Sequence, residues 1–210
     1  MIKKLFFAGI LLTITSVEAM AQQTWFEFDV TKELGEKWEM YLAPELRFNE
    51  DFGLEEYFAE PGVKYKFNDY FSLEASYRVG SDRSKDGEDH WFGRFAFDAK
   101  TGYGWNNLWT KVRLRQTNSD DFTEGEKASY FRLKFDLGYT IRELNLDPYV
   151  AYELYRDLDE GEFNKARWET GLQYKISTQQ RISAYFRLND HIHSDKESKK
   201  IVGLSYKFKW

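Results

Sequence analysis

The amino-acid sequence predicts an all-β protein, a transmembrane up-and-down antiparallel β-barrel of about 10 to 12 strands. Three observations predict this fold. The chain is 19% aromatic and 31% charged, with a mean hydropathy of -0.68. Apolar and polar residues alternate along segments of about 10 to 12 residues, close to the length that a tilted strand needs to cross a bilayer. The connections between these segments are alternately short and long, as in outer-membrane barrels.

The first 21 residues have the pattern of a cleaved signal peptide. Lys3 and Lys4 are basic, residues 5–17 are apolar, and residues 19–21 form a small-x-small cleavage site. An inner-membrane anchor is the alternative, but this apolar run is shorter than the roughly 20 residues of a spanning helix. We therefore expect a single mature domain, residues 22–210, which is exported without disulfides because the chain has no cysteine.

Eleven amphipathic segments follow, and each is expected to be a strand. In residues 38–48 the even positions, among them Trp38 and Leu42, are apolar, whereas odd positions such as Glu39 are polar. Residues 128–139 repeat this period of two, while a helix would need apolar residues three and four apart. In order, the expected strands are residues 24–33, 38–48, 57–67, 71–80, 90–101, 107–117, 128–139, 146–156, 165–176, 181–190 and 200–210.

The connections indicate the orientation of the barrel. Short ones such as "LGEK", "NDY" and "STQQ" are assigned to the periplasm and the longer ones to the cell exterior. The last strand then ends in the periplasm, but an odd total puts the start of the first strand outside. Since bacterial single-chain barrels normally have an even number of strands, either residues 24–33 lie outside the wall or one crossing is not recognised. A count of 10, 11 or 12 strands therefore stays open from the sequence.

Aromatic residues fall where the interfacial girdles of a membrane barrel are expected. The expected periplasmic girdle consists of Trp38, Phe67, Phe71, Trp105, Tyr139, Tyr174 and Trp210, and the extracellular one of Phe48, Tyr57, Trp91 and Trp168. A soluble β-sandwich or lipocalin-like barrel also alternates and is the alternative fold. Its apolar face would point inward, where the large side chains of strands this long would not fit.

Two longer stretches and Trp25 carry a resemblance to a known family. The stretches are "EEYFAEPGVKYKFNDYFSLEASYR" and "DPYVAYELYRDLDEGEFNKARWETGLQYKIS", the second with Pro148, Glu153, Arg167 and a Gly-x-x-Tyr at residues 171–174. With these residues the chain resembles the Bacteroidetes-type family of small outer-membrane β-barrels known as domain of unknown function 2490. The resemblance implies location and fold, and it supplies no catalytic residues.

Charge placement gives the strongest functional signal. Inward positions of the expected strands hold a net charge of about +7, whereas the five long loops together hold about -13. We therefore predict a narrow channel with a basic, anion-biased lumen. The expected pore-lining residues are Arg94, Lys111, Arg113, Arg115, Arg132, Lys134, Arg167 and Arg187. The alternative is an occluded structural barrel in which facing charges pair, as Glu153 and Arg167 are expected to do across a hairpin.

A hydrolase with its site at the extracellular rim is the alternative from another class. All three histidines, His90, His191 and His193, fall at expected extracellular strand ends. Ser194 and Asp195 directly follow the last of them. No nucleophile elbow accompanies them, and the His-x-His pair with one aspartate is an incomplete metal site. Solvated loop histidines are the simpler interpretation, so no catalytic residue, metal or cofactor is expected.

The final segment, "IVGLSYKFKW", alternates to its last residue and ends on Trp210. An aromatic end of this kind resembles the signal read by the barrel-assembly machinery, which we expect as a partner during biogenesis. Outer-membrane lipid, lipopolysaccharide and small anionic solutes are the other expected partners, and nucleic acid is not one. The acidic loops lack the oxygen-ligand spacing of a calcium site. The expected location is the bacterial cell outer membrane.

Overall fold

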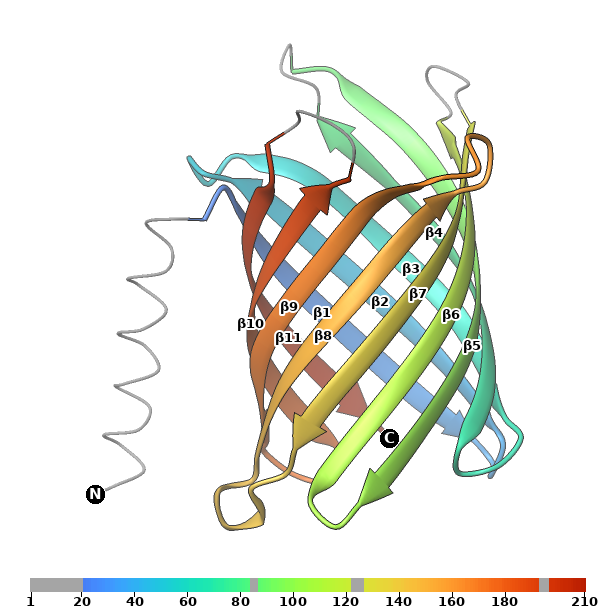
Figure 1. The fold of residues 1–210 in the computed structure, drawn as a ribbon, viewed down its shortest axis with the longest axis vertical. Coiled ribbons are helices and arrows are strands. Elements are labelled where there is room, and N and C mark those ends of the chain that lie inside the picture. Colours follow the sequence, from blue (N-terminus) through green and yellow to red (C-terminus); the bar gives the residue numbers. More distant parts are fainter. Residues whose placement is uncertain (1–20, 84–86, 122–126, 193–196) are drawn as a thin grey trace.

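The computed structural model describes residues 21–83, 87–121, 127–192 and 197–210, which form a single β-barrel (Figure 1). The expected signal peptide therefore lies, apart from residue 21, outside the described residues. The strands are β1 (Gln23–Leu34), β2 (Trp38–Asn49), β3 (Leu54–Lys66), β4 (Phe71–Arg83), β5 (Asp89–Trp105), β6 (Leu108–Asp121), β7 (Lys127–Tyr139), β8 (Leu146–Asp157), β9 (Phe163–Lys175), β10 (Gln180–His191) and β11 (Lys199–Lys209), with a short 3-10 helix η1 (Arg142–Leu144) before β8. Among these residues, no helix is long and apolar enough to cross a membrane.

The barrel closes with an odd number of strands. Each strand pairs antiparallel with the next, and β1 pairs in parallel with β11 from Gln23 opposite Ile201 to Thr31 opposite Lys209. The eleven expected strands are thus all present, and the even totals of ten and twelve are wrong. Residues 24–33 belong to the wall because their main-chain groups continue the ladder on both sides, to β2 and to β11.

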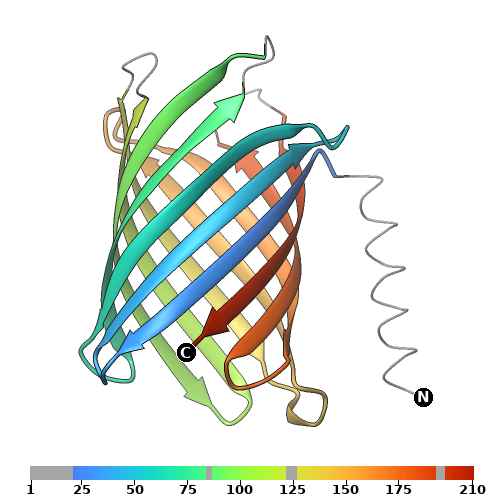
Figure 2. The same cartoon turned by 180° about the vertical axis from the view of Figure 1, so that it is seen from behind.

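The two ends of the barrel carry different connections. We call the lower end the one with connections 35–37, 67–70, 106–107, 140–145 and 176–179, and the upper end the opposite one. Because β1 and β11 are parallel, β1 begins at the upper end, whereas the chain ends at the lower one, as both views show (Figures 1 and 2). The described chain therefore starts and finishes at opposite ends of the barrel.

The expected alternation in connection length is not kept. Connection 50–53 at the upper end is shorter than connection 140–145 at the lower end. Strands extend beyond their expected bounds, as β5 does to Trp105 and β6 to Asp121. The reason is that main-chain hydrogen bonds continue the ladder where the apolar side-chain pattern has already ended.

The two faces of the wall have opposite character. Large apolar side chains are exposed on the outer face of every strand from β1 to β10, for example Phe28, Met40, Val63, Leu73, Phe97, Leu114, Leu137, Val150, Trp168 and Ile182. Charged and polar side chains point inward and line a central cavity. This is the reverse of a soluble barrel with an apolar core, so the sandwich or lipocalin-like alternative is wrong.

Aromatic side chains are exposed at the lower end as the sequence predicts. Trp38, Phe67, Phe71, Trp105, Tyr139 and Trp210 are all exposed there. Phe208 and Trp210 stack with ring centroids 5.3 Å apart at the end of β11. Trp168, which the sequence predicts near the upper end, instead lies in the middle of β9 and packs against Tyr152 of β8 with ring centroids 4.2 Å apart. Exposed aromatic rings thus mark the lower ends of the strands.

Inward side chains hold the parallel seam between β1 and β11. Tyr185 of β10 lies over Gly203 of β11, where a Cβ would collide with its ring, and its hydroxyl reaches Glu27 of β1. At the lower end, Lys209 of β11 forms an ion pair with Glu33 of β1 at 2.7 Å and another with Glu39 of β2. Glycine is therefore required at position 203 because the Tyr185 ring approaches its backbone closely. The contacts of Tyr185 with Glu27 and of Lys209 with Glu33 connect the two sides of the seam at two levels of the lumen.

Candidate functional site

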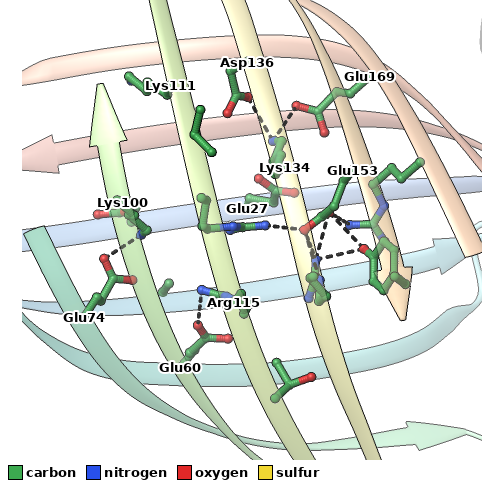
Figure 3. Close-up of a pocket in the computed structure, with 18 of the residues that line it drawn as sticks. Glu27, Glu60, Glu74, Lys100, Lys111, Arg115, Lys134, Asp136, Glu153 and Glu169 are labelled. Carbon is green, nitrogen blue, oxygen red and sulfur yellow. Dashed lines mark hydrogen bonds and ion pairs between the residues drawn. The ribbon is translucent and has the colours of Figure 1, made fainter. Parts of the chain in front are cut away.

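The interior of the barrel encloses a cavity of about 1430 Å³. Its lining includes Asp69 and Tyr70 from a lower connection and Glu160, Glu162 and Ile192 from upper ones. Side chains from both ends of the barrel thus contribute to one cavity, which makes the lumen the candidate site. Figure 3 shows its charged side chains projecting from several strands toward one another.

The charge of the lining is smaller than the sequence count suggests. Thirteen acidic and fifteen basic residues line the cavity, a net charge of +2. The expectation of about +7 counted only inward positions of the expected strands and left out carboxylates such as Asp157, Glu160 and Glu162, which lie in the lining. Most charge in the lumen is therefore balanced, and any preference for anions depends on where the remaining bases lie.

All eight side chains expected to line a pore are part of the cavity wall. They are Arg94, Lys111, Arg113, Arg115, Arg132, Lys134, Arg167 and Arg187. They come from β5, β6, β7, β9 and β10, because alternate positions of each strand point inward. Six of them contact carboxylates, whereas Arg94 and Lys111 take part in none of the ion pairs formed by described residues.

Glu153 on β8 is the centre of a cluster with three arginines, and only 1% of its side chain is exposed. Arg113 donates from Nη2 to Glu153 Oε1 at 2.6 Å, and Arg132 donates from Nε and Nη2 to its two oxygens, each at 3.0 Å. The expected partner, Arg167, is the most distant of the three, with Nη1 3.7 Å from Oε2. The predicted pair thus exists, but it is the weakest part of a three-arginine cluster.

A second cluster lies on β3 to β6. Arg115 donates from Nε and Nη2 to the two oxygens of Asp98, both at 2.6 Å, in a bidentate pair. Arg78 donates to Glu60 at 2.7 Å, and Arg115 Nη2 lies 3.8 Å from the same carboxylate (Figure 3). Lys100 donates to Glu74 at 2.6 Å. These contacts fix the side chains of this wall against one another.

A third cluster connects the seam to the opposite wall. Arg187 of β10 donates from Nε to Glu169 at 2.7 Å and from Nη2 to Glu27 of β1 at 3.4 Å. Lys134 of β7 lies between Asp136, at 3.2 Å, and Glu169, at 3.6 Å (Figure 3). Because buried charges are costly unless they are paired, these clusters explain how so polar an interior is tolerated.

Trp25 is an inward aromatic residue whose role the alternation pattern alone does not predict. Only 4% of it is exposed, although it faces the lumen. The guanidinium carbon of Arg47 lies 3.7 Å from its ring centroid, and that of Arg187 lies 4.8 Å away. The indole is thus held between cations, an arrangement that is favourable for both partners.

Four bases of the cavity lining take part in none of the ion pairs between described residues. They are Arg94 and Lys165 toward the upper end and Lys111 and Lys207 toward the lower end. Lys165 was not among the expected site residues, although its inward position on β9 follows from the same alternation. Carboxylates without an ion pair to a described residue line the same two ends, namely Asp157, Glu160 and Glu162 at the upper end and Asp29 and Asp69 at the lower one, so both signs of charge stand on either side of the paired clusters.

The residues of the alternative hydrolase are only partly described. His191 lines the cavity near the upper end, and His90 lies opposite Asp82 in the β4–β5 ladder. His193, Ser194 and Asp195 lie outside the described residues. Within the described part of the chain, no group of three or more histidine, aspartate or glutamate side chains is placed to hold a metal ion.

Fold and lumen together define the class: a closed, eleven-stranded β-barrel with an apolar outer face and a charged interior. The family described as "Protein of unknown function (DUF2490)" matches residues 22–199, and the chain belongs to this family.

Solved structures similar to this chain are outer-membrane proteins of Vibrio cholerae. One is an outer-membrane expressed OmpT, with 15% identity, a TM-score of 0.43, and coverage of 73% of this chain and 54% of that one. Another is a loop L8 deletion mutant of OmpT, with 14% identity, a TM-score of 0.44, and coverage of 81% and 62%. The matched region thus spans less than two thirds of each of the two OmpT chains. No curated protein matches the sequence.

Proposed function

We propose that this protein is an outer-membrane β-barrel whose lumen is a narrow aqueous passage with a preference for small anions. The observation that carries the proposal is the single cavity lined by residues from the connections at both ends of the barrel. A water-filled, polar interior behind an apolar outer wall is the arrangement of a barrel that conducts solutes across a membrane.

The membrane location rests on the outer face. Exposed apolar side chains on β1 to β10 would be costly in water, whereas hydrocarbon would cover them at no such cost. Trp38, Trp105 and Trp210 at the lower end supply the interfacial anchors of this arrangement. With the lower end in the periplasm, the expected partners are lipid, lipopolysaccharide and, during biogenesis, the barrel-assembly machinery.

The preference for anions rests on the net charge of +2 over the whole lining. Lys111 and Lys207 line the lower lumen and both are exposed to it, while Arg94 and Lys165 line the upper lumen. Five lining carboxylates, Asp29, Asp69, Asp157, Glu160 and Glu162, also form no ion pair with a described residue, so the sign of the field that a passing ion meets is set by the balance of all the lining charges.

A second candidate function, an occluded structural barrel, is favoured by the burial of the paired side chains. Only 9% of the Arg115 side chain and 9% of the Arg187 side chain are exposed, so the lumen is narrow where the clusters lie. Planar-bilayer recording of the refolded barrel separates the two candidates. Stepwise ionic conductance is expected for a passage, and the absence of any conductance would overturn the channel in favour of the occluded barrel.

A further inference from the structure

Three inward aromatic rings and three arginines form a continuous stack in the upper part of the lumen. In order along the stack, its members, which we call the stacked row, are Phe58, Arg47, Trp25, Arg167, Tyr155 and Arg132. The successive distances between guanidinium carbon and ring centroid are 5.0, 3.7, 5.9, 5.3 and 4.4 Å. A cation is attracted by a ring face within about 6 Å of its centroid, so every contact in the row is favourable.

The stacked row crosses the lumen as well as following its wall. Trp25 is on β1 and Arg167 is on β9, and the strands β10 and β11 lie between these two in the wall. The contact between Trp25 and Arg167 therefore runs across the interior. Every member of the row lies within six residues of the upper end of its strand, so the row is confined to the upper half of the barrel.

One end of the stacked row reaches β6 through a shared carboxylate. Arg132, the last member of the row, pairs with Glu153 at 2.9 Å. Arg113 of β6 pairs with the same carboxylate at 2.6 Å. Because β6 and β8 are separated by β7, this link also runs across the interior of the barrel.

The other end of the row reaches the same strand. Arg78 of β4 lies with its guanidinium carbon 3.6 Å from the Phe58 ring centroid and donates to Glu60 at 2.7 Å. Glu60 in turn lies 3.8 Å from Arg115 (Figure 3). Since Arg115 is on β6, as Arg113 is, the stacked row and these ion pairs close into a complete circuit around the lumen, which we call the collar.

The aromatic members of the collar face the interior but are almost closed to water. Only 4% of Trp25, 5% of Phe58 and 7% of Tyr155 is exposed. In the lower lumen, by contrast, the inward side chains of Lys111 and Lys207 are exposed. The side chains therefore leave less open space at the level of the collar than below it.

We propose that the collar is the barrier that sets the size limit of the lumen, admitting small ions and excluding neutral solutes as large as a sugar. Trp25 is the residue that keeps the collar narrow, because Arg47, Arg167 and Arg187 all contact its indole, at 3.7, 5.9 and 4.8 Å. A deleted buried side chain leaves a cavity that its surroundings fill only in part. The assignment deepens the proposed function, on which it rests for the passage of solutes through the lumen.

The lower lumen offers a matched control, Trp109. This tryptophan also lines the cavity, but it lies on β6 near the lower end and contacts Lys111 at 4.9 Å, outside the collar. Replacing either tryptophan with alanine removes the same side-chain volume from the lumen. Only Trp25→Ala opens the collar.

Swelling of lipid vesicles that contain the refolded barrel, in an isosmotic solution of the neutral pentose arabinose, tests the collar. Vesicles with the wild-type protein or W109A are expected to exclude arabinose and keep their size, whereas vesicles with W25A are expected to admit it and swell. Exclusion of arabinose by W25A, or its entry at the same rate through W25A and either of the other two proteins, would overturn the proposal.

Arg167 provides a second variant in case W25A does not fold. It joins Trp25 to Tyr155 in the stacked row, and its ion pair with Glu153 is long, at 3.7 Å. R167A is expected to admit arabinose, and the matched control R181A, near the lower end of β10, is expected to exclude it. Because arabinose is neutral, the lost charge does not by itself change its entry. Exclusion of arabinose by a folded R167A would contradict the assignment.

Current through planar bilayers separates this proposal from the proposed function. A wild-type barrel without conductance, together with a W25A variant that conducts, overturns the open passage and supports the collar as the barrier. Wild-type conductance that W25A leaves unchanged overturns the collar alone. The absence of conductance in both proteins overturns the passage and the collar together.

Discussion

Glu153 is the side chain whose loss should most weaken the barrel. It is almost fully buried and pairs with three arginines at 2.6 to 3.7 Å. Replacing it with glutamine removes the counter-charge while the three guanidinium groups stay in the lumen. Breaking a buried ion pair by removing one partner costs about 3 to 5 kcal/mol. We therefore expect Glu153→Gln to lower the free energy of unfolding by about 3 kcal/mol or more.

Glu33 provides the matched control for this change. Its side chain is 48% exposed and pairs with Lys209 at 2.7 Å and with Lys66 at 3.6 Å. An exposed pair contributes little, so Glu33→Gln should cost less than about 1 kcal/mol. Both variants lose one carboxylate to the same substitution, and only their burial and number of partners differ.

The assay is urea unfolding of the refolded barrel, followed by tryptophan fluorescence, with the transition compared between variants. A double variant, E153Q/R132Q, should be less destabilised than the sum of its single variants, because removing Arg132 relieves part of the uncompensated charge. The reasoning would be refuted if E153Q were no less stable than E33Q. Strict additivity of E153Q and R132Q would refute the direct contact between them.

Three further predictions concern the wall and its orientation. Gly203→Val should lower the free energy of unfolding by about 1 to 3 kcal/mol in the same assay, because the valine side chain would collide with Tyr185. Gly104→Val should lower it little, because only the Leu108 carbonyl oxygen lies nearby, at 3.8 Å. Equal effects would contradict the packing at the seam. Phe97 lies in the middle of β5 on the outer face, so Phe97→Lys should lower the free energy of unfolding in lipid vesicles by about 2 to 4 kcal/mol. Tyr103→Lys, near the end of the strand, should lower it by at most about 1 kcal/mol. No difference between the two variants would argue against lipid around the barrel. An epitope inserted before Gln23 should be reached by antibody on intact cells and one after Trp210 only after permeabilisation; the reverse pattern would contradict the assigned orientation.

Much of the fold follows from the period of two along the chain. Alternation of Trp38 and Leu42 with Glu39 depends only on neighbours in sequence, so it locates β2 without any knowledge of its partners. The closure does not follow in the same way. Whether β1 pairs with β11 depends on main-chain groups at opposite ends of the chain, and the expectation of an even total pointed away from the parallel seam.

The site could be predicted as a set of inward positions, but not as a set of pairs. The sequence predicts a pair between Glu153 and Arg167 because they face each other across a hairpin. The closest arginine is Arg113, which comes from β6 and reaches past β7 with its long side chain. Lys165 shows the opposite case. Its inward position can be predicted from the alternation along β9, but its position 5.2 Å from the Tyr155 ring centroid depends on how the strands are arranged in space.

The structure also changes which substitutions test selectivity. Arg113 and Arg115 hold the buried carboxylates Glu153 and Asp98, so exchanging them for acids would destabilise the lumen as well as alter its field. Lys111 and Lys207 hold no such partner among the described residues. Replacing both with glutamate turns the lining from fifteen bases and thirteen acids, a net +2, into thirteen bases and fifteen acids, a net -2.

The reversal potential of the refolded barrel in a planar bilayer, under a gradient of potassium chloride, tests the central claim most directly. Because the lining carries a net charge of +2, we expect the sign of the wild-type reversal potential to indicate a preference for chloride. K111E/K207E, which makes the net charge of the lining -2, should shift the reversal potential toward that of potassium. Potassium preference in the wild type, or no shift in the variant, would contradict the account.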